Sequence, residues 1–412
     1  MSAIAFAQSE DLDDIIAGLD AFLVSEVFPR YETNREIMEE PRRYFSADGR
    51  YSPEVVQMMR EIRMASAEAG YFNISVPEVM GGGGMGFGTY FACLEHVFRR
   101  CGGNRTFGQY AISHWAYGPS AVLSGLTDEA KERVLKPLLT GAQMMCFGMS
   151  EPDAGSDVAR IRTTADSAQG GGWLLNGRKI WTSHAPIAEW MIVLAVTDRE
   201  LSVQRRGGIS AFMVPMNAPG VRVERVIRMW GEGGGQEAET AFEDVAVEPW
   251  QLVGTLNQGF RIGMQGVSLG RVFNCARAIG LGRWALEMAI EYTKSRVVFD
   301  RPISDYQGVM FPLAESFTEL HAAHLLALNA AALLDAGQGA VKELSMAKMT
   351  AVRAGARAVD RAIQAHGAIG FTNELGLTEA YRHLRQVNVA DGTNEILTRT
   401  IVNRLLKGDV AI

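Results

Sequence analysis

Cysteines and long apolar runs are both scarce in this chain of 412 residues. The four cysteines show neither CxxC nor Cys/His ligand spacing; they are Cys93, Cys101, Cys146 and Cys275. So few cysteines in so long a chain do not make a disulfide framework. No apolar stretch approaches the length needed to span a bilayer. We therefore expect a protein of a reducing compartment, the cytoplasm, without a membrane span.

An excess of basic residues is also missing. The net charge of -7 argues against nucleic acid as the main ligand. An acidic protein can still keep a local basic pocket for a phosphorylated substrate, and a small molecule is the expected partner. The first residues end in the acidic run 10–14 and lack the basic and apolar regions of a secretory signal. We therefore expect no secretory leader.

The length predicts two or three domains. Apolar residues recur at steps of three and four in 12–23 and 55–62, which indicates amphipathic helices. Further helices are expected at 90–100, 109–123 and 127–139. The glycine run 81–84 lacks the lysine and Ser/Thr of a P-loop, so it is interpreted as a turn. Residues 1–142 are thus predicted to form an N-terminal helical domain.

Beyond residue 142 the pattern becomes β-like. Short strands separated by glycine and polar turns are expected at 173–175, 191–196, 209–214 and 241–247. These define a middle domain, 143–250. Apolar residues again recur at steps of three and four at 313–334 and 349–363. This pattern indicates an antiparallel helix bundle in a third domain, 251–412. The predicted fold is mainly α, with a central β-barrel-like domain and a C-terminal four-helix bundle.

A single carboxylate, Asp391, stands before the last helix in the stretch NVADGTNEI, residues 388–396. An aspartate before Gly-Thr-Asn is ordinary turn or helix N-cap chemistry, because its side chain accepts from free backbone N–H groups. The alternative is a catalytic base. His321 and His324 share a helix face, but no carboxylate or cysteine at ligand spacing completes a metal set. No metal site is predicted.

Five ordered motifs resemble one family, the acyl-CoA dehydrogenases, over essentially the whole chain. They are MSEPDAGSD (149–157), NGRKIWTSHA (176–185), SRVVFDRPISDYQ (295–307), QAHGAIGF (364–371) and ADGTNEI (390–396). The resemblance implies the three-domain fold, FAD as cofactor and desaturation of acyl-CoA thioesters. It also implies electron-transfer flavoprotein or a similar electron acceptor.

The resemblance implies a slot for the flavin ring. Trp181 would lie against the ring, and the Ser183 hydroxyl would bond near its reactive nitrogen. Phe147, Met149 and Ser150 would contact the same ring. A core aromatic and a strand-end hydroxyl are the ordinary alternatives for Trp181 and Ser150. Ser156 would lie near the pyrophosphate and the substrate's pantetheine.

The other half of FAD is implied to reach a neighbouring protomer. Arg296, Phe299 and Gln307 would face its adenosine diphosphate, where a guanidinium pairs with phosphate oxygens. A homotetramer or homodimer is therefore expected.

The C-terminal motifs are implied to complete the cofactor site. Gln364, Gly367 and Ala368 resemble a loop that usually reads Gln-x-x-Gly-Gly, so Ala368 adds a methyl group. Thr393 and Glu395 would add contacts at a helix N-terminus, which suits an anion.

The implied reaction removes a proton α to the thioester carbonyl and transfers the β-hydrogen as hydride to FAD N5. Asp391 would be the base, and its backbone N–H would help stabilise the enolate-like oxygen. Arg271 and Gly392 would bind substrate, together with Ser156. The family usually has glutamate as base, and some members carry it at the position of Gly270. Aspartate is one methylene shorter, a reach deficit of up to about 1.5 Å.

Two alternatives stay open. Family relatives with an aspartate base include enzymes for alicyclic acyl-CoA thioesters and nitroalkane oxidases, which act on carbon acids without CoA. The nitroalkane relative has an arginine seven residues after its base, whereas this chain has Thr398 there and Arg399 one further. An oxidase or monooxygenase is thus one alternative, and a non-catalytic flavin-binding interaction protein is the other.

Overall fold

The computed structural model describes residues 10–411. Residues 1–9, on which the expected absence of a leader largely rests, lie outside this range. The described chain forms two compact units, which are treated separately. The helical unit comprises residues 10–29, 85–109 and 271–411, and the sheet unit comprises residues 30–84 and 110–270.

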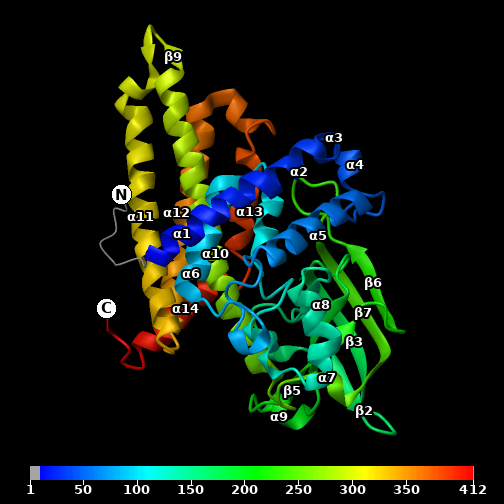
Figure 1. Cartoon of the computed structure of the whole chain (residues 1–412). Helices are drawn as coiled ribbons and strands as arrows, with labels where there is room; N and C mark the ends of the chain where they lie inside the picture. The colour runs from blue at the N-terminus through cyan, green and yellow to red at the C-terminus, as the bar shows by residue number, and fades with distance from the viewer. Residues whose placement is uncertain (1–9, 412) are drawn as a thin grey trace. The chain divides into compact units, whose positions relative to one another are not determined.

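Long helices build the helical unit. In Figure 1, α10, α11 and α12 run side by side, and a hairpin of β9 and β10 projects beyond the ends of α10 and α11. Its elements are α1 (Glu10–Phe22), α6 (Phe87–Cys101), α10 (Gly259–Ser295, which begins in the sheet unit), β9 (Val297–Val298), β10 (Arg301–Pro302), α11 (Gln307–Asp335), α12 (Val341–His366), α13 (Leu377–Val387) and α14 (Asn394–Leu405).

Small residues let the helices approach closely. A Cβ added to Gly355 of α12 would lie 2.3 Å from the carbonyl oxygen of Ala278 in α10, so only glycine fits this crossing. The carboxylate of Asp335, at the end of α11, accepts from the N–H of Phe87 at 2.6 Å and so satisfies the start of α6. Helices far apart in sequence are thereby fixed within one unit.

A buried carboxylate contacts His324, one of the two histidines that share a helix face in the bundle. Glu95 of α6 is 3% exposed and contacts the guanidinium of Arg283 and, at 2.6 Å, Nδ1 of His324. Although burial alone raises the pKa of Glu95, these two partners hold it below its ordinary value. His324 is therefore bound to Glu95 through Nδ1, while its Nε2 is buried without a hydrogen-bond partner among residues 10–411.

One helix differs from the expectation about apolar runs. By length and composition alone, α11 is long and apolar enough to cross a membrane, with 28% of its most apolar window buried. Core helices of soluble bundles meet the same criterion. Within the helical unit α11 packs along α12, and ion pairs such as Arg357–Glu319 at 2.9 Å join the two.

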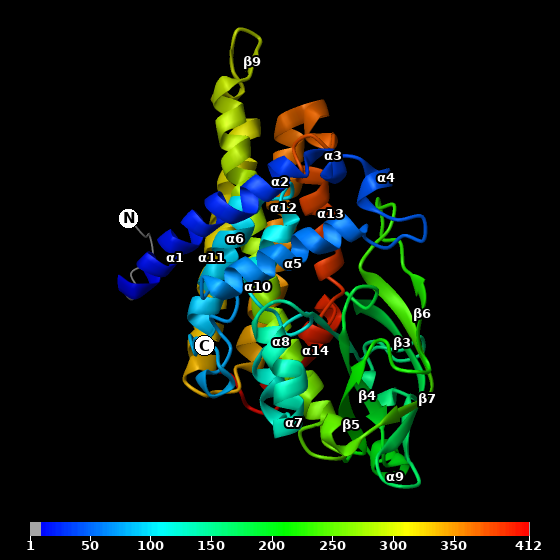
Figure 2. The same cartoon turned by 45° about the vertical axis from the view of Figure 1, so that its right-hand side comes forward.

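A sheet dominates the other unit, as Figure 2 shows. Its path runs β6-β7-β3-β2-β4-β5-β8, and β1 pairs in parallel with β4. The strands are β1 (Met145–Gly148), β2 (Thr164–Ser167), β3 (Trp173–Ser183), β4 (Trp190–Val196), β5 (Ile209–Pro215), β6 (Val221–Val226), β7 (Glu237–Val247) and β8 (Leu252–Val253). The path has two ends, so this sheet is not a closed barrel.

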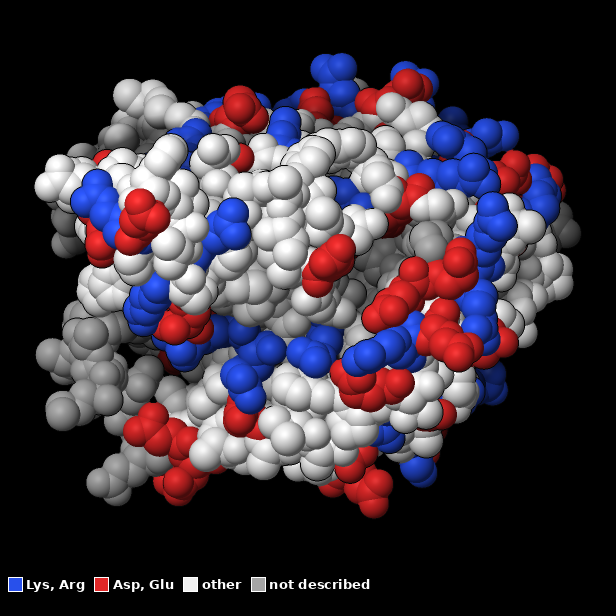
Figure 3. All heavy atoms as spheres, turned by 90° about the horizontal axis from the view of Figure 1, so that it is seen from above, with Lys and Arg blue, Asp and Glu red and all other residues white. Residues whose placement is uncertain are grey.

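One longer helix, α5, and several short helices complete the sheet unit. They are α3 (Arg35–Met38), α4 (Pro41–Tyr44), α5 (Pro53–Glu68), α7 (Asp128–Ala130), α8 (Lys136–Leu139) and α9 (Arg199–Val203), with α2 (Phe28–Thr33) at the boundary. On the face shown in Figure 3, basic and acidic side chains are interspersed. The pair Arg43–Glu36, at 2.8 Å, is an example within this unit.

The predicted fold class is confirmed: helices precede a β domain, and helices follow it. One expected helix, 109–123, is wrong. That stretch forms 3₁₀ turns at Thr106–Ala111 and Ala121–Gly125 instead. Tertiary partners supply its backbone bonds, since the N–H of Ser113 donates to the carbonyl of Phe72 at 2.8 Å, and Pro119 cannot donate at all.

Candidate active site

Strands β1 and β3 position the predicted flavin residues of the sheet unit. Phe147 is 7% exposed and packs edge-on against Trp115, with ring centroids 4.8 Å apart. Gly148 is tightly enclosed, because an added Cβ would lie 2.8 Å from the sulfur of Met191. Met149 and Ser150 leave the strand half-buried. The end of β1 is thus rigid where these two residues emerge.

A buried ion pair holds the segment after β1 against β3. Nζ of Lys179, a fully buried residue, donates to Oε1 of Glu151 at 2.7 Å and to the carbonyl of Met149 at 3.2 Å. The N–H of Ile180 also donates to the carbonyl of Ser150 at 2.9 Å. Burial lowers the pKa of Lys179 to about 8, against the pull of Glu151. The segment 149–151 is therefore held at both its backbone and its side chain.

Trp181 and Ser183 lie at an irregular end of β3. The pairing of β3 with β7 shifts register between Lys179 and Thr182, and Trp181 has a left-handed φ of 59°. Trp181 is 57% exposed, so it is not a core aromatic. The hydroxyls of Ser150 and Ser183, both half-buried, have no hydrogen-bond partner among residues 10–411. An exposed flat ring beside two free hydroxyls suits a planar cofactor with polar edges.

The candidate base lies in the helical unit, in the turn between α13 and α14. Asp391 has a φ of 52°, and its neighbour Gly392 has a φ of 91°. The N-cap of α14 is Thr393, whose hydroxyl accepts from the N–H of Ile396 at 3.3 Å. Asp391 is therefore not the helix cap, and its carboxylate is available for another role.

Helix α10 supplies two contacts to this turn. The amide of Asn274 donates to Oδ2 of Asp391 at 2.7 Å. Nε of Arg271 donates to the carbonyl oxygen of Asp391 at 3.2 Å, and Gly392 lies against the same guanidinium, with 3.3 Å from its ideal Cβ to Nη2. The structure thus brings Arg271, Asp391 and Gly392 together.

A buried lysine closes the turn from the side of α12. Nζ of Lys348, a fully buried residue, donates to the carbonyl oxygens of Val387 (2.6 Å), Ala390 (2.9 Å) and Gly392 (3.0 Å). An ammonium has three donors, and all three are used. Burial lowers the pKa of Lys348 to about 8, although nearby Asp391 opposes this.

The surroundings of Asp391 raise its pKa. Burial raises the pKa of Asp391 above its ordinary value of 3.8. The charges of Lys348, Arg271 and Arg277 and the hydrogen bond from Asn274 lower it again in part. A carboxylate with a raised pKa is a stronger base than an exposed aspartate.

The remaining predicted cofactor residues of the helical unit are exposed. Phe299 is 86% exposed at the tip of the β9–β10 hairpin, and Arg296 and Gln307 are exposed at its base. At the end of α12, Gln364, Gly367 and Ala368 are exposed. Ser156 in the sheet unit and Glu395 at the first turn of α14 are exposed as well. The structure keeps the hairpin far from Asp391, since Arg271 to Ser295 spans about 36 Å of helix.

Sequence reasoning missed three residues that organise the site: Lys179, Asn274 and Lys348. Asn274 stands three residues after Arg271, so the helical period places both on one face and could have indicated it. Lys179 lies inside a recognised motif. Lys348 is a lysine within the apolar stripe of α12, which is a weaker sequence indication. Only the fold shows which carbonyls its ammonium contacts.

Sequence comparison covers almost the whole chain. Family profiles match in order: acyl-CoA dehydrogenase N-terminal domain at residues 29–142, middle domain at 146–245 and C-terminal domain at 257–406. A 3-(aryl)acrylate reductase of Clostridium sporogenes is 35% identical to this chain, over 86% of this chain and 92% of the reductase. The chain belongs to the acyl-CoA dehydrogenase family.

Further relatives agree with this. The caffeyl-CoA reductase-Etf complex subunit CarC of Acetobacterium woodii is 34% identical, over 92% of this chain and 96% of that protein. The solved butyryl-CoA dehydrogenase from Megasphaera elsdenii superposes with a TM-score of 0.82 at 25% identity, over 98% of this chain and 100% of that one. This acyl-CoA dehydrogenase family member is a flavin-dependent oxidoreductase with FAD as its cofactor.

Proposed function

We propose that the chain catalyses α,β-dehydrogenation of an acyl-CoA thioester, with Asp391 as the base that removes the α-proton. The observation that carries this proposal is the free backbone N–H of Asp391. It donates to no acceptor among residues 10–411, although the carbonyl of the same residue is held by Arg271. One residue thus offers a carboxylate and an unpaired N–H side by side, as α-proton removal next to a carbonyl requires.

The chain's own groups divide the work. Asn274 occupies Oδ2 of Asp391, so Oδ1 remains to take the proton. The N–H of Asp391 donates to the thioester carbonyl oxygen as negative charge develops there. Lys348 and Arg271 fix the backbone that carries both groups. The short aspartate side chain requires close approach of the substrate, and a turn tied at three carbonyls keeps the base from moving away.

FAD fits the residues that the family motifs assign to it. The exposed indole of Trp181 offers a face for the ring, and the free hydroxyls of Ser150 and Ser183 offer bonds to its edge. Phe147 and Met149 would support the ring from β1. Thr393 and Glu395 would meet the cofactor at the start of α14, and Ser156 and Gly392 would contact the substrate. Bound FAD accepts the β-hydrogen as hydride.

The exposed hairpin supports assembly. Arg296, Phe299 and Gln307 lie beyond the far end of α10, too distant from Asp391 to share a cofactor with it inside one helical unit. We infer that they serve the FAD of a neighbouring protomer, with Gln364, Gly367 and Ala368, in a homodimer or homotetramer. The large exposed apolar side chains Phe311 and Phe317 of α11 fit such an interface.

Electron-transfer flavoprotein is the proposed electron partner. One relative is named as a subunit of a reductase-Etf complex, and another is named an acrylate reductase. Those names favour a second candidate direction, in which the same site reduces a conjugated acyl compound. The same residues serve both directions, because a proton and a hydride are returned where they were removed.

An anaerobic titration tests the proposal. Purified FAD-loaded protein is mixed with straight, branched, alicyclic and aryl acyl-CoAs, and the flavin absorbance is followed. We expect bleaching by one acyl-CoA class and its loss in Asp391→Asn. For the reverse direction, dithionite-reduced protein is mixed with the matching enoyl-CoA. Bleaching by a nitroalkane alone, or by no acyl-CoA, would contradict the proposal.

A further inference from the structure

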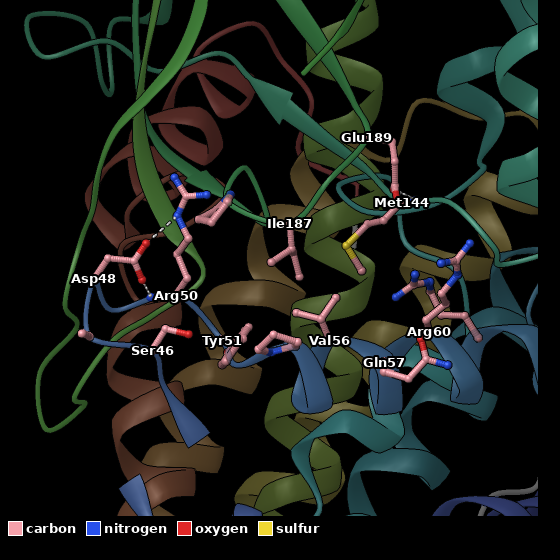
Figure 4. Close-up of a pocket in the computed structure, with 14 residues that line it drawn as sticks. Ser46, Asp48, Arg50, Tyr51, Val56, Gln57, Arg60, Met144, Ile187 and Glu189 are labelled. Atoms are coloured by element: carbon pink, nitrogen blue, oxygen red, sulfur yellow. Dashed lines mark hydrogen bonds and ion pairs between the residues drawn. The ribbon is translucent and has the colours of Figure 1, made fainter. Parts of the chain in front are cut away.

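A cavity in the sheet unit lies apart from every residue assigned above. Its volume is about 700 Å³, and it opens between the start of α5 with its preceding loop and the turn that follows β3. All its lining residues belong to the sheet unit. In Figure 4, Arg60 and Gln57 lie at the end near Met144 and Glu189, and Asp48 and Arg50 lie at the other end.

Arg63 is the unusual member of this lining. It is 4% exposed, and its Nε donates to the carbonyl oxygen of Gly141 at 3.1 Å. Its two terminal nitrogens have no hydrogen-bond partner among residues 10–411, and no carboxylate of that range lies in ion-pair contact with it. Burial lowers the pKa of Arg63 to about 10, so the side chain is still a cation at neutral pH. A buried guanidinium whose four terminal N–H donors have no protein partner is costly unless water or an anion meets them.

Arg60 adds a second positive charge. It stands one turn before Arg63 on α5, is exposed, and has no ion pair within the described chain. The two acidic residues of the lining are already engaged. Oε2 of Glu189 accepts from the N–H of Met144 at 2.7 Å, and Asp48 pairs with Arg50 at 3.1 Å. The two cations of α5 therefore face the cavity without a carboxylate in ion-pair contact, and the charge of Glu189 acts on Arg63 only from a longer distance.

Apolar side chains form the middle of the cavity. Val56 and Ile187 lie between its two charged ends in Figure 4, and Pro186 joins them in the lining. A cavity of this size accepts a small organic molecule. Two adjacent guanidinium groups match the planar oxygens of a carboxylate or the oxygens of a phosphate.

We propose that this cavity binds a small organic anion, with its carboxylate or phosphate on Arg63 and Arg60 and its apolar body against Val56 and Ile187. The site is independent of the proposed dehydrogenation, because its lining contains neither Asp391 nor any predicted flavin residue. Ile187 belongs to the turn directly after Ser183 and His184, and the N–H of Ile187 donates to the carbonyl of His184 at 2.9 Å. A bound ligand therefore contacts the turn next to the flavin wall.

Calorimetric titration of the FAD-loaded protein tests the site. Benzoate and phenyl phosphate are the probes, because each joins an oxyanion to an apolar ring, and benzamide is the neutral match of benzoate. We expect one or both anions to bind at least 10-fold more tightly than benzamide. Benzoate alone indicates a carboxylate ligand, and phenyl phosphate alone indicates a phosphate ligand.

Three variants locate the binding. Arg63→Gln and Arg60→Gln should each weaken it about 10-fold or more, which corresponds to the loss of one charge-assisted bond. Val56→Glu places a negative charge in the cavity, which repels an anionic ligand, and should abolish binding. Arg206→Gln removes an exposed arginine of the same unit outside the lining and should change nothing. Because Arg60 and Val56 are accessible, their variants keep the test valid should Arg63→Gln fail to fold.

Three outcomes would overturn the proposal. They are equal affinity for benzamide and benzoate, unchanged affinity in both Arg60→Gln and Val56→Glu, and no binding of either anion at about 10 mM. None of them bears on the acyl-CoA titration, so the two proposals fail separately.

Discussion

The side-chain amide of Asn274 donates to Oδ2 of Asp391 at 2.7 Å, although 117 residues of sequence separate them. Asn274 is 4% exposed in the interior of α10, so its amide is held in place by packing. This bond orients the carboxylate and leaves its other oxygen free. The carboxylate of the candidate base is therefore oriented by α10, while Lys348 of α12 holds the backbone of its turn.

Replacing Asp391 by asparagine should separate stability from activity. The variant keeps the size of the side chain but removes the base, so turnover should fall about 10²- to 10⁴-fold. Because burial raises the pKa of Asp391, the ionised carboxylate is disfavoured in the folded protein, and the neutral amide should raise the midpoint of urea unfolding at pH 7. Kinetics and urea titrations of both proteins measure this. Unchanged turnover would remove Asp391 from the mechanism.

The raised pKa also predicts the acid limb of the reaction. The rate should decline as pH falls through the folded-state pKa of Asp391, which lies above 3.8. The contribution of Asp391 to folding stability should change with pH in the opposite direction. The protonated carboxyl contributes stability fully below pH 3.8, and that contribution is lost as pH rises through the folded-state pKa. Profiles of kcat/KM and of Tm against pH should show both trends in the parent, and Asp391→Asn should lack the Tm trend.

Asn274→Ala should move the acid limb of the pH–rate profile to higher pH. The hydrogen bond from Asn274 favours the ionised form of Asp391, so its removal raises the pKa of the base. A merely structural role would lower the rate at all pH values without moving the limb. Asn274→Asp is the informative companion, because a second carboxylate at 2.7 Å should push the limb further in the same direction. An unmoved limb in both variants would contradict the assignment.

Lys348 should impose an alkaline limb near pH 8. The pKa of Lys348 is lowered to about 8, and a neutral amine has only two donors for its three carbonyl acceptors. Activity should therefore fall above pH 8 as the turn that carries Asp391 loosens. Lys348→Arg, which stays charged, should shift this limb to higher pH. Lys348→Met should lose activity across the range.

Two controls keep this prediction specific. Between pH 8 and 10.5 the unfolded chain binds more protons at Lys348 than the folded one, so the contribution of Lys348 to stability rises there. Lost activity without a parallel loss of Tm therefore indicates the turn and not global unfolding. Lys342→Arg, at a second buried lysine of α12 whose pKa is raised by Asp409, should leave the limb in place.

Lys179→Met should lower the free energy of unfolding of the sheet unit. It leaves Glu151, which is 7% exposed, without its cation, and an unpaired buried charge costs about 3–5 kcal/mol. Urea unfolding measures the loss, and adding Glu151→Gln should restore part of it. Arg178→Met removes only an exposed arginine 3.5 Å from Glu239, which keeps its pair with Arg225 at 2.9 Å, so it should cost about 0–1 kcal/mol. Equal losses in the two single variants would contradict the buried-pair account.

The sequence predicted much of the fold because periodicity is a local signal. The apolar stripe 349–363 lies within α12, and the runs 191–196 and 209–214 lie within β4 and β5. The predicted helix 109–123 failed because its bonds are made to distant partners such as Phe72. The expectation that no stretch has the length and composition of a membrane span failed at α11, whose charges are confined to a few positions.

By itself, the sequence determined the order of the elements, the family motifs and the one carboxylate in the last turn. It left open whether Asp391 caps α14 or serves as a base. The tertiary structure decided only the cap, which Thr393 takes, while α10 and α12 bring Asn274, Arg271 and Lys348 to the turn. Those contacts, like the burial of Lys179 and Arg63, join residues distant along the chain. Only packing sets the desolvation that shifts their pKa values.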